Sequence, residues 1–406
     1  MDVDHAVLRP GPGWVGQWFM DRALATLPFV FGVLRDHWPV LRLGKTYLVT
    51  RHDDVRAVFA DDEAFGVPYK AKLDVILAKE PFVLGMSDGA EYRAGIAALR
   101  RVVRLSDIPA LADRVEAMAA AIVQESDGEV EIVEMVRRIS FDFLADYLGV
   151  PQPEGADLKL WVTRLFEYQF VADDDALRSE VAEIAPALRD HVQRAIDLRR
   201  AAPEARDDVL ARCLALKAGG APEFDDAQIR TALIGLIVGG PPQPPMVVPQ
   251  AMEQLLRRPA ALAGAQAAAR AGDDRQLAAH VAEAMRFDPL APWMPRITLA
   301  ARTIGKGRTA RVIPMDVKVL ASIASAMRDE RRVPDPRRFD VTRDADQYLH
   351  FGWGIHQCFG LEINRATLHR MIKPLLTRAN LRRAPGRAGR LRKRGAFASS
   401  LTVRFD

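Results

Sequence analysis

The sequence has only two cysteines, Cys213 and Cys358, in 406 residues. Two thiols so far apart do not support a disulfide framework and fit a reducing compartment, so we expect a cytoplasmic protein. Residues 1–14 contain neither an apolar run long enough to span a bilayer nor a basic-then-apolar export signal, so we expect no membrane span. The chain also lacks linkers, low-complexity tracts and internal repeats, which predicts one large domain over residues 1–406.

A large excess of charge of one sign is also missing. The net charge is +4, and the basic residues are spread along the chain except for a run at 382–394. Nucleic-acid binding would require basic residues interleaved with aromatic ones on one surface, and the sequence has no such interleaving, so we expect no nucleic-acid partner. Apolar residues make up 49% of the chain and charged residues 27%, which is typical of a globular protein with a large core.

Apolar residues recur at helical spacing along most of the chain, which predicts a mainly α protein. The expected helices cover residues 52–60, 89–104, 108–125, 132–148, 155–170, 177–200, 225–257, 275–287 and 359–377. Strand-like alternation predicts a hairpin at 38–50 with Leu41, Leu43, Tyr47 and Val49 facing inward, and further strands at 310–320 and 401–404. The predicted fold is a helical body with a small, separate β region.

One short stretch, residues 351–360, combines residue types that favour a reactive thiolate. Gly352 and Gly354 permit a tight turn, Cys358 follows it, and a helical pattern begins directly afterwards. The positive end of a helix and its free backbone N–H groups favour the thiolate form of a cysteine, which is a strong ligand for iron. A lone cysteine can equally be a small buried apolar residue, and its own chemistry leaves that alternative open.

The same stretch, F-G-W-G-I-H-Q-C-F-G, resembles the haem-binding loop F-G-x-G-x-H-x-C-x-G of the cytochrome P-450 family, and the resemblance extends along nearly the whole chain. It implies the cytochrome P-450 fold, with haem b (iron protoporphyrin IX) buried between distal and proximal helices. By resemblance, Cys358 is the iron ligand and His356 hydrogen-bonds a haem propionate. Phe351 would pack beside the sulfur, whereas Gly352 and Gly360 would shape the loop and let the next helix approach the porphyrin.

Three further residues resemble a structural element that the family places upstream of this loop. Glu283 and Arg286 form an E-x-x-R pair on one face of a predicted helix. In the family, this pair joins an arginine of a P-x-R-F segment, which here is Arg338 in Pro-Arg-Arg-Phe. A guanidinium held between carboxylate and carbonyl oxygens would brace the loop that presents Cys358. We expect these three residues to be structural.

Two more residues are matched to the haem propionates by resemblance. Arg296, in Pro-Arg-Ile-Thr, matches a family arginine that reaches a propionate from a strand. Tyr92 stands where bacterial relatives often place a histidine, and its hydroxyl can donate a hydrogen bond. A solvated surface arginine is the alternative explanation for Arg296.

The predicted distal helix departs from the family pattern [AG]-G-x-[DE]-T-[TS], whose acid and threonine help deliver protons to bound dioxygen. The run from Gly239 to Pro245 reads G-G-P-P-Q-P-P. With Gly239 and Gly240 aligned, Pro242 replaces the acid and Gln243 replaces the threonine. Four prolines within five residues are expected to break the helix over the iron. Gln243 can donate a hydrogen bond but cannot act as an acid, so the candidate distal catalytic residues are Gly239, Gly240 and Gln243.

Three explanations of the missing acid remain open. The first is a mono-oxygenase for a small hydrophobic substrate that positions protons through water, substrate groups or Gln243. The second is a peroxygenase, or an enzyme that rearranges or dehydrates hydroperoxides, which needs no dioxygen activation because the O–O bond is already present. The third is a haem-binding protein without turnover, because a fold alone does not establish activity.

A substrate pocket with apolar walls is expected by resemblance, although the same residues can be ordinary core residues. Its candidates are Phe82, Val83, Leu84, Ile237, Leu290, Trp293, Met294 and Phe397. A basic group on the proximal face can attract an acidic ferredoxin or a flavin reductase, although a solvated helix face explains it equally well. This proximal basic group consists of Arg100, Arg101, Arg104, Arg365, Arg370 and Lys373.

Overall fold

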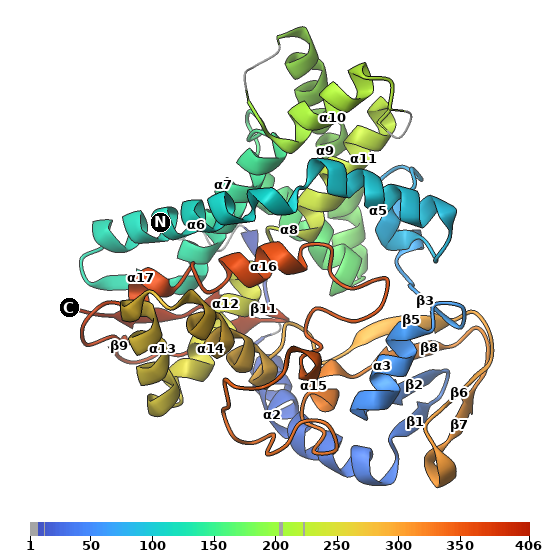
Figure 1. Cartoon of the computed structure of the whole chain (residues 1–406), viewed down its shortest axis with the longest axis vertical. Helices are drawn as coiled ribbons and strands as arrows, with labels where there is room; N and C mark the ends of the chain where they lie inside the picture. The colour runs from blue at the N-terminus through green and yellow to red at the C-terminus, as the bar shows by residue number, and fades with distance from the viewer. Residues whose placement is uncertain (1–6, 12, 203–205, 222–223) are drawn as a thin grey trace.

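The computed structural model describes residues 7–11, 13–202, 206–221 and 224–406, and helices make up most of it. They are α2 (Trp14–His37), α3 (His52–Ala60), α4 (Lys70–Ile76), α5 (Ala90–Val102), α6 (Ile108–Glu125), α7 (Ile132–Leu148), α8 (Leu158–Phe170), α9 (Asp175–Ala201), α10 (Val209–Ala218), α11 (Asp226–Gly239), α12 (Pro244–Leu256), α13 (Pro259–Ala271), α14 (Asp274–Phe287), α15 (Ile323–Ala326), α16 (Leu361–Thr367) and α17 (Lys373–Leu376). Figure 1 shows these helices forming most of the molecule.

The strands are short. They are β1 (Val40–Leu43), β2 (Thr46–Val49), β3 (Phe65–Gly66), β4 (Glu129–Glu131), β5 (Met294–Thr298), β6 (Arg302–Ile304), β7 (Arg311–Ile313), β8 (Lys318–Ala321), β9 (Arg382–Arg383), β10 (Arg392–Arg394), β11 (Phe397–Ser400) and β12 (Thr402–Arg404). The largest sheet has the order β1-β2-β8-β5-β3, and Figure 1 shows it at one corner of the molecule beside α3. Within it, β2 pairs in parallel with β8, and β8 pairs antiparallel with β5.

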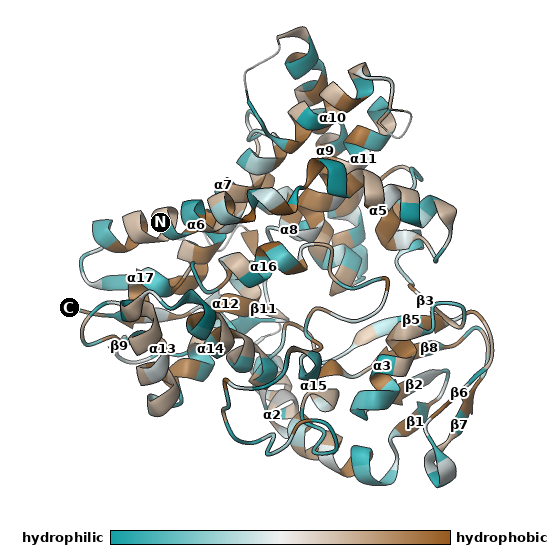
Figure 2. Cartoon of the chain, viewed as in Figure 1, coloured by the Kyte–Doolittle hydropathy of each residue, from teal (hydrophilic) through white to brown (hydrophobic). Residues whose placement is uncertain are grey.

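Two consecutive helices, α11 and α12, cross the helical body. Helix α11 packs against α8 and α9, whereas α12 packs against α7 and α14. Ile229, Leu233 and Ile237 of α11 are fully buried in the main core. Figure 2 shows hydrophobic residues along the inner parts of α8 and α11, with hydrophilic residues mainly on outward-facing turns. Burial of these apolar faces is the main term that stabilises the helical body.

The mainly helical fold with a small β region is confirmed. The expected helix at 225–257 is two helices, α11 and α12, and the one at 359–377 is reduced to the short helices α16 and α17. The sequence analysis did not identify α2, α4, α10 or α13. The hairpin is present, with Tyr47 and Val49 buried, but Leu43 is 53% exposed, because it pairs with Thr46 and so lies on the face of the hairpin opposite to Tyr47 and Val49. Among the described residues, no helix has the length and apolarity needed to cross a bilayer.

Candidate functional site

The loop that leads into α16 has a backbone shape that its glycines make possible. Gly352 and Gly354 have φ angles of 73° and 78°, in the left-handed region that L side chains rarely adopt. A Cβ at Gly354 would also lie 2.2 Å from the carbonyl oxygen of Phe59 at the end of α3. The loop then closes on itself, because the Cys358 N–H donates to the Phe351 carbonyl at 2.9 Å. This turn places the Cys358 thiol immediately before α16.

The Cys358 thiol is half-buried and faces few polar groups. Burial raises its pKa above the ordinary value, while a backbone hydrogen bond from Gly360, the charge of Arg100 and a contact with Asn364 lower it. The Asn364 Nδ2 lies 4.0 Å from the sulfur. The sequence predicted that the helix start and the nearby backbone N–H groups lower this pKa, but desolvation of the thiolate outweighs them in the chain by itself. A bound metal cation would reverse this balance.

Gly360 leaves space beside the sulfur that the chain itself does not need. Its φ of −83° is open to any residue, so backbone strain does not select glycine here. An added Cβ would meet only the Asn364 Nδ2 at 3.3 Å and the Cys358 sulfur at 3.9 Å. A glycine at this place fits a site where a flat group approaches the sulfur closely.

Tyr92 and His356 lie together, although they come from distant parts of the chain. Their ring centroids are 5.2 Å apart, and the Tyr92 hydroxyl donates to the Ile355 carbonyl. Burial and the nearby charge of Arg296 lower the pKa of His356 to about 4, so the imidazole is neutral at pH 7. Because the single O–H of Tyr92 is already used within the loop, Tyr92 braces His356 and has no donor left for a second acceptor.

Arg296 is a buried cation in the β region that forms no ion pair with the described residues. It lies on β5 opposite Val319 of β8, is 3% exposed, and has its guanidinium carbon 4.8 Å from the centre of the Phe59 ring. Its Nη1 donates to the carbonyl of Pro295, its own neighbour, at 3.0 Å, whereas its Nε has no hydrogen-bond partner. No carboxylate among the described residues forms an ion pair with it. An additional anionic group beside it would stabilise a buried guanidinium in this state.

A fully buried network on α14 fixes the segment before the loop, with both Glu283 and Arg286 at 0% exposure. Arg286 binds both Glu283 oxygens, at 2.7 and 2.8 Å, and donates to the carbonyl oxygen of Arg338 at 3.2 Å. The third member of the network is Arg343, whose Nε lies 3.2 Å from Glu283, and Tyr348 donates to the same carboxylate at 3.1 Å. The sequence prediction of Arg338 is thus corrected, because its own side chain is exposed and only its carbonyl takes part.

The break in the distal helix is confirmed. Helix α11 ends at Gly239, and α12 begins at Pro244. Gln243 connects the two helices, because its Nε2 donates to the Gly239 carbonyl at 2.6 Å, an acceptor that the interrupted helix leaves unpaired. The Ser140 hydroxyl of α7 donates to the Pro241 carbonyl at 2.9 Å. Gln243 therefore has a structural contact, and the break itself contains neither a carboxylate nor a hydroxyl side chain.

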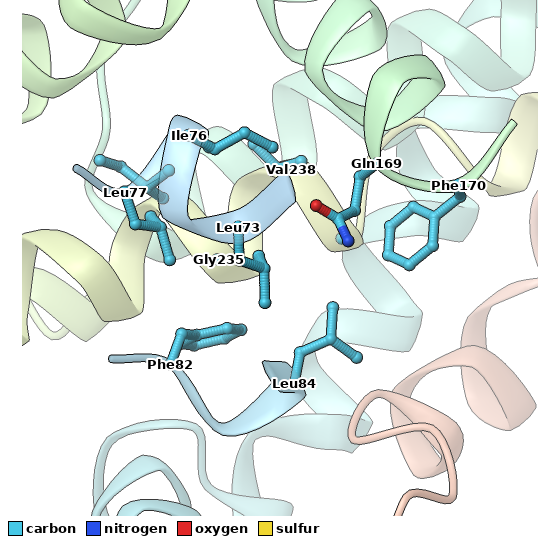
Figure 3. Close-up of a pocket in the computed structure, with 11 residues that line it drawn as sticks. Leu73, Ile76, Leu77, Phe82, Leu84, Gln169, Phe170, Gly235 and Val238 are labelled. Carbon is cyan, nitrogen blue, oxygen red and sulfur yellow. The ribbon is translucent and has the colours of Figure 1, made fainter. Parts of the chain in front are cut away.

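A small, mostly apolar pocket lies over α11 (Figure 3). Phe82 and Leu84 line it as expected, and a Cβ at Gly235 would lie 2.3 Å from the Phe82 ring. Further walls of the pocket come from α4, α8 and α11. The lining residues on these helices are Leu73, Ile76, Leu77, Gln169, Phe170, Ile234, Gly235, Val238 and Gly239.

Several predicted pocket residues lie elsewhere. Ile237 is fully buried in the main core, and Val83 packs against Gly95 of α5. Phe397 lines a second cavity, which lies behind the break in the distal helix. Three predicted residues at or just before the start of β5 are half-buried and line neither of these cavities. They are Leu290, Trp293 and Met294. Phe82 and Leu84 line the pocket over α11, and substrate contact by the other residues stays a prediction.

The second cavity contains a buried hydroxyl. It is lined by Leu8, Arg137, Thr163, Pro242, Pro245, Met246, Phe397 and Ala398. Thr163 of α8 is 4% exposed, and it lines this cavity together with Pro242. Arg137, also buried, binds Glu134 at 2.9 Å. The cavity thus presents polar groups to Pro242, which takes the place of the family acid.

The proximal basic group is partly neutralised. Arg370 and Lys373 share the carboxylates of Glu116 and Asp274, with N–O distances of 2.5–2.9 Å. These four residues bind α6, α14 and α17 together and leave little net charge at that place. The basic surface expected from the sequence is therefore smaller than the residue count suggests.

Comparison with known proteins agrees with this geometry. The family model for cytochrome P450 matches residues 165–398. Cyclomarin C epoxidase CymV of Salinispora arenicola is 26% identical over 347 residues, covering 82% of this chain and 84% of that protein. Cytochrome P450-SU2 of Streptomyces griseolus is 30% identical over 344 residues, covering 82% and 80%. The ligand-free structure of cytochrome P450 TbtJ1 superposes with a TM-score of 0.79 at 25% identity, covering 94% and 98%.

A mainly helical fold with a glycine-shaped cysteine loop defines a haem-thiolate class of protein, and the chain belongs to the cytochrome P450 family. It is an oxidoreductase, and the cofactor of this family is haem. The residues present fit that group. A half-buried thiol has space beside it at Gly360, and an unpaired buried cation at Arg296 can meet a propionate.

Proposed function

We propose that the whole chain forms one haem-thiolate domain that binds haem b through Cys358. The Cys358 thiolate would hold the iron, and Gly360 would give the porphyrin room beside the sulfur. Arg296 and His356 would bind the propionates, and the carbonyl of Phe351 would fix the turn at the Cys358 N–H. The observation that carries this proposal is the buried guanidinium of Arg296, which has no anionic partner within the described chain.

Replacing Arg296 with methionine tests this assignment through two effects of opposite sign. The haem-free protein should become more stable by about 1–3 kcal/mol, because an uncompensated buried charge is removed. Haem affinity should fall at least about tenfold, because a buried charge pair is lost. Chemical denaturation of the haem-free protein measures the first effect, and haem transfer to an excess of apomyoglobin measures the second.

A suitable control is Arg302→Met. Arg302 lies in the same β region but pairs with Asp61 at 3.2 Å, so its replacement should leave haem transfer unchanged. The assignment is wrong if the haem-free Arg296→Met protein is less stable than the haem-free parent and the variant transfers its haem no faster than the parent. Arg296 would then contribute only to the fold.

The best supported reaction is mono-oxygenation of an apolar substrate. One oxygen atom of dioxygen enters a C–H bond or a double bond of the substrate, and two electrons with two protons convert the other atom to water. Bound haem supplies the redox chemistry of this step. The chain itself supplies an apolar pocket over α11 that excludes water and positions the substrate.

The two protons need a source, because the break in the distal helix contains no acid. The second cavity offers a candidate, since Thr163 and Pro242 both line it. A water bound to Thr163 Oγ1 would lie in the cavity that Pro242, which takes the place of the family acid, also lines. We therefore propose that Thr163 binds this water and that Gln243 connects the two helices at the break.

A peroxide-dependent reaction is the second candidate, and the same missing acid favours it. The oxygen of a hydroperoxide is already two electrons more reduced than dioxygen. One of its oxygen atoms enters the substrate, and the other leaves as an alcohol. No electrons and no net protons are needed. General acid catalysis commonly contributes a factor of about 10²–10⁴ in rate. The missing acid therefore slows dioxygen activation, which consumes protons, more than it slows a reaction that starts from a hydroperoxide.

The two candidates separate in one assay of the purified holoprotein. A fatty-acid hydroperoxide is added without reductase or NAD(P)H, and its consumption is followed. Rapid consumption supports the peroxide-dependent reaction. Oxidation of an apolar substrate that requires a ferredoxin or flavin reductase, NAD(P)H and dioxygen supports mono-oxygenation and contradicts the alternative.

Two variants refine this assay. Thr163→Val should reduce the fraction of consumed NAD(P)H that yields oxidised product at least severalfold, because the proposed water is lost. Gln243→Ala should lower stability by about 1 kcal/mol through loss of its bond to Gly239, with little change in that fraction. The opposite pattern would assign proton positioning to Gln243.

A further inference from the structure

Gln169 is the one polar side chain among the described residues that line the pocket over α11. It lies at the C-terminal end of α8, is 4% exposed, and its Oε1 has no hydrogen-bond partner. The other side chains that line this pocket are apolar. An unpaired acceptor in apolar surroundings is destabilising and is uncommon in folded proteins.

The orientation of this amide follows from its other end. The Gln169 Nε2 donates to the Tyr69 carbonyl at 3.3 Å, and an inverted amide would oppose two oxygens there. Figure 3 shows the Gln169 side chain extending into the pocket between Val238 and Phe170. The Oε1 atom is therefore available to a molecule in the pocket.

An ordered water is a poor occupant for this position. A buried water normally makes two to four hydrogen bonds, and the pocket lining offers Oε1 as its only unpaired side-chain acceptor among the described residues. The carbonyl of Gly239, which also lies on the pocket, already accepts from Gln243. A ligand that brings one donor and otherwise apolar surface suits the lining better.

We propose that Gln169 determines substrate specificity by accepting a hydrogen bond, through Oε1, from a hydroxyl or N–H group of an otherwise apolar substrate. This inference rests on the proposed function, because it places the substrate in the pocket over α11. Leu73, Leu84 and Val238 contact the apolar part of the substrate, and Gln169 selects for the donor. The substrate class is thus an apolar alcohol, amine or amide rather than a plain hydrocarbon.

The test uses two probes of similar size, cyclohexanol and methylcyclohexane, which differ by a hydroxyl in place of a methyl group. Dissociation constants are measured by titrating the holoprotein and following the haem absorption spectrum. The parent protein should bind cyclohexanol more tightly than methylcyclohexane. Gln169→Met, which keeps the side-chain length, should lower this preference about five- to tenfold.

Leu84→Val is the matched control, because Leu84 lines the same pocket without a polar atom. It should change the affinity of both probes by a similar factor and preserve their ratio. The melting temperature of Gln169→Met should stay within about 3 °C of the parent, because an unpaired acceptor and one long hydrogen bond are removed together.

The inference is overturned if Gln169→Met leaves the ratio unchanged, or if cyclohexanol binds no more tightly than methylcyclohexane, including the case in which neither binds. A large fall in melting temperature would also overturn it, because it would show that Oε1 is paired within the folded protein. Failure of the proposed function looks different, because the sulfur-ligated haem spectrum would then be missing before any probe is added.

Discussion

Cys358→Ala is expected to remove the red-shifted absorption that the reduced, carbon-monoxide-bound protein shows when sulfur ligates the iron. Alanine keeps the turn, because the backbone bond from residue 358 to the Phe351 carbonyl does not use the side chain. Without the thiolate the iron loses its proximal ligand, so oxidation should fall by several orders of magnitude. The measurement is the carbon-monoxide difference spectrum of the purified variant.

Cys213→Ala provides a matched control for this variant. Cys213 is fully buried in α10, and burial raises the pKa of its thiol to about 12, so it stays protonated and cannot readily ligate a metal. Its replacement should preserve the spectrum, although the small cavity left behind lowers stability somewhat. A Cys358→Ala protein with an unchanged spectrum would refute sulfur ligation by this residue.

Arg343→Ala is expected to destabilise the protein by about 3–5 kcal/mol, because it leaves the buried Glu283 carboxylate short of a cationic partner. The Arg343 side chain also donates to the carbonyl oxygens of Pro334, Asp335 and Arg338, at 2.7–3.2 Å. These bonds hold the segment that leads to the cysteine loop. Denaturant unfolding and haem retention at raised temperature measure the effect.

Arg338→Ala separates the observed network from the one predicted by resemblance. The Arg338 side chain is exposed and contributes only its backbone carbonyl, so its removal should change stability by less than about 0.5 kcal/mol. If Arg343→Ala does not accumulate, Arg343→Lys keeps the charge and should lose part of the stability. An equal loss of stability in Arg338→Ala and Arg343→Ala would contradict the network described above.

The cysteine loop and the helix break were predictable because each depends on local chemistry. Gly352 and Gly354 are needed for positive φ angles, and four prolines cannot continue a helix. Arg343 was not predictable from the P-x-R-F match. The choice between neighbouring arginines depends on how the chain folds back onto Glu283.

Gln169 and α2 were missed for a related reason. Nothing near Gln169 in the sequence indicates that its oxygen faces an apolar pocket, because the walls come from α4, α8 and α11. Helix α2 contains Pro28 and exposes Phe29 at 77%, so it lacks the regular apolar face by which helices are recognised. Pocket residues such as Ile237 were misplaced because a helix that is apolar all round does not reveal which side faces a cavity.

The cysteine loop has contacts with the β region on one side as well as with the helical body. Gly354 touches the last turn of α3, and Arg296 of β5 stacks over Phe59 in the same turn. A cofactor held by both Cys358 and Arg296 would cross-link the cysteine loop and the β region. Cofactor release and local unfolding of the β region would then be one cooperative event, so inactivation by heat would follow the lifetime of the bound cofactor rather than the stability of the main core.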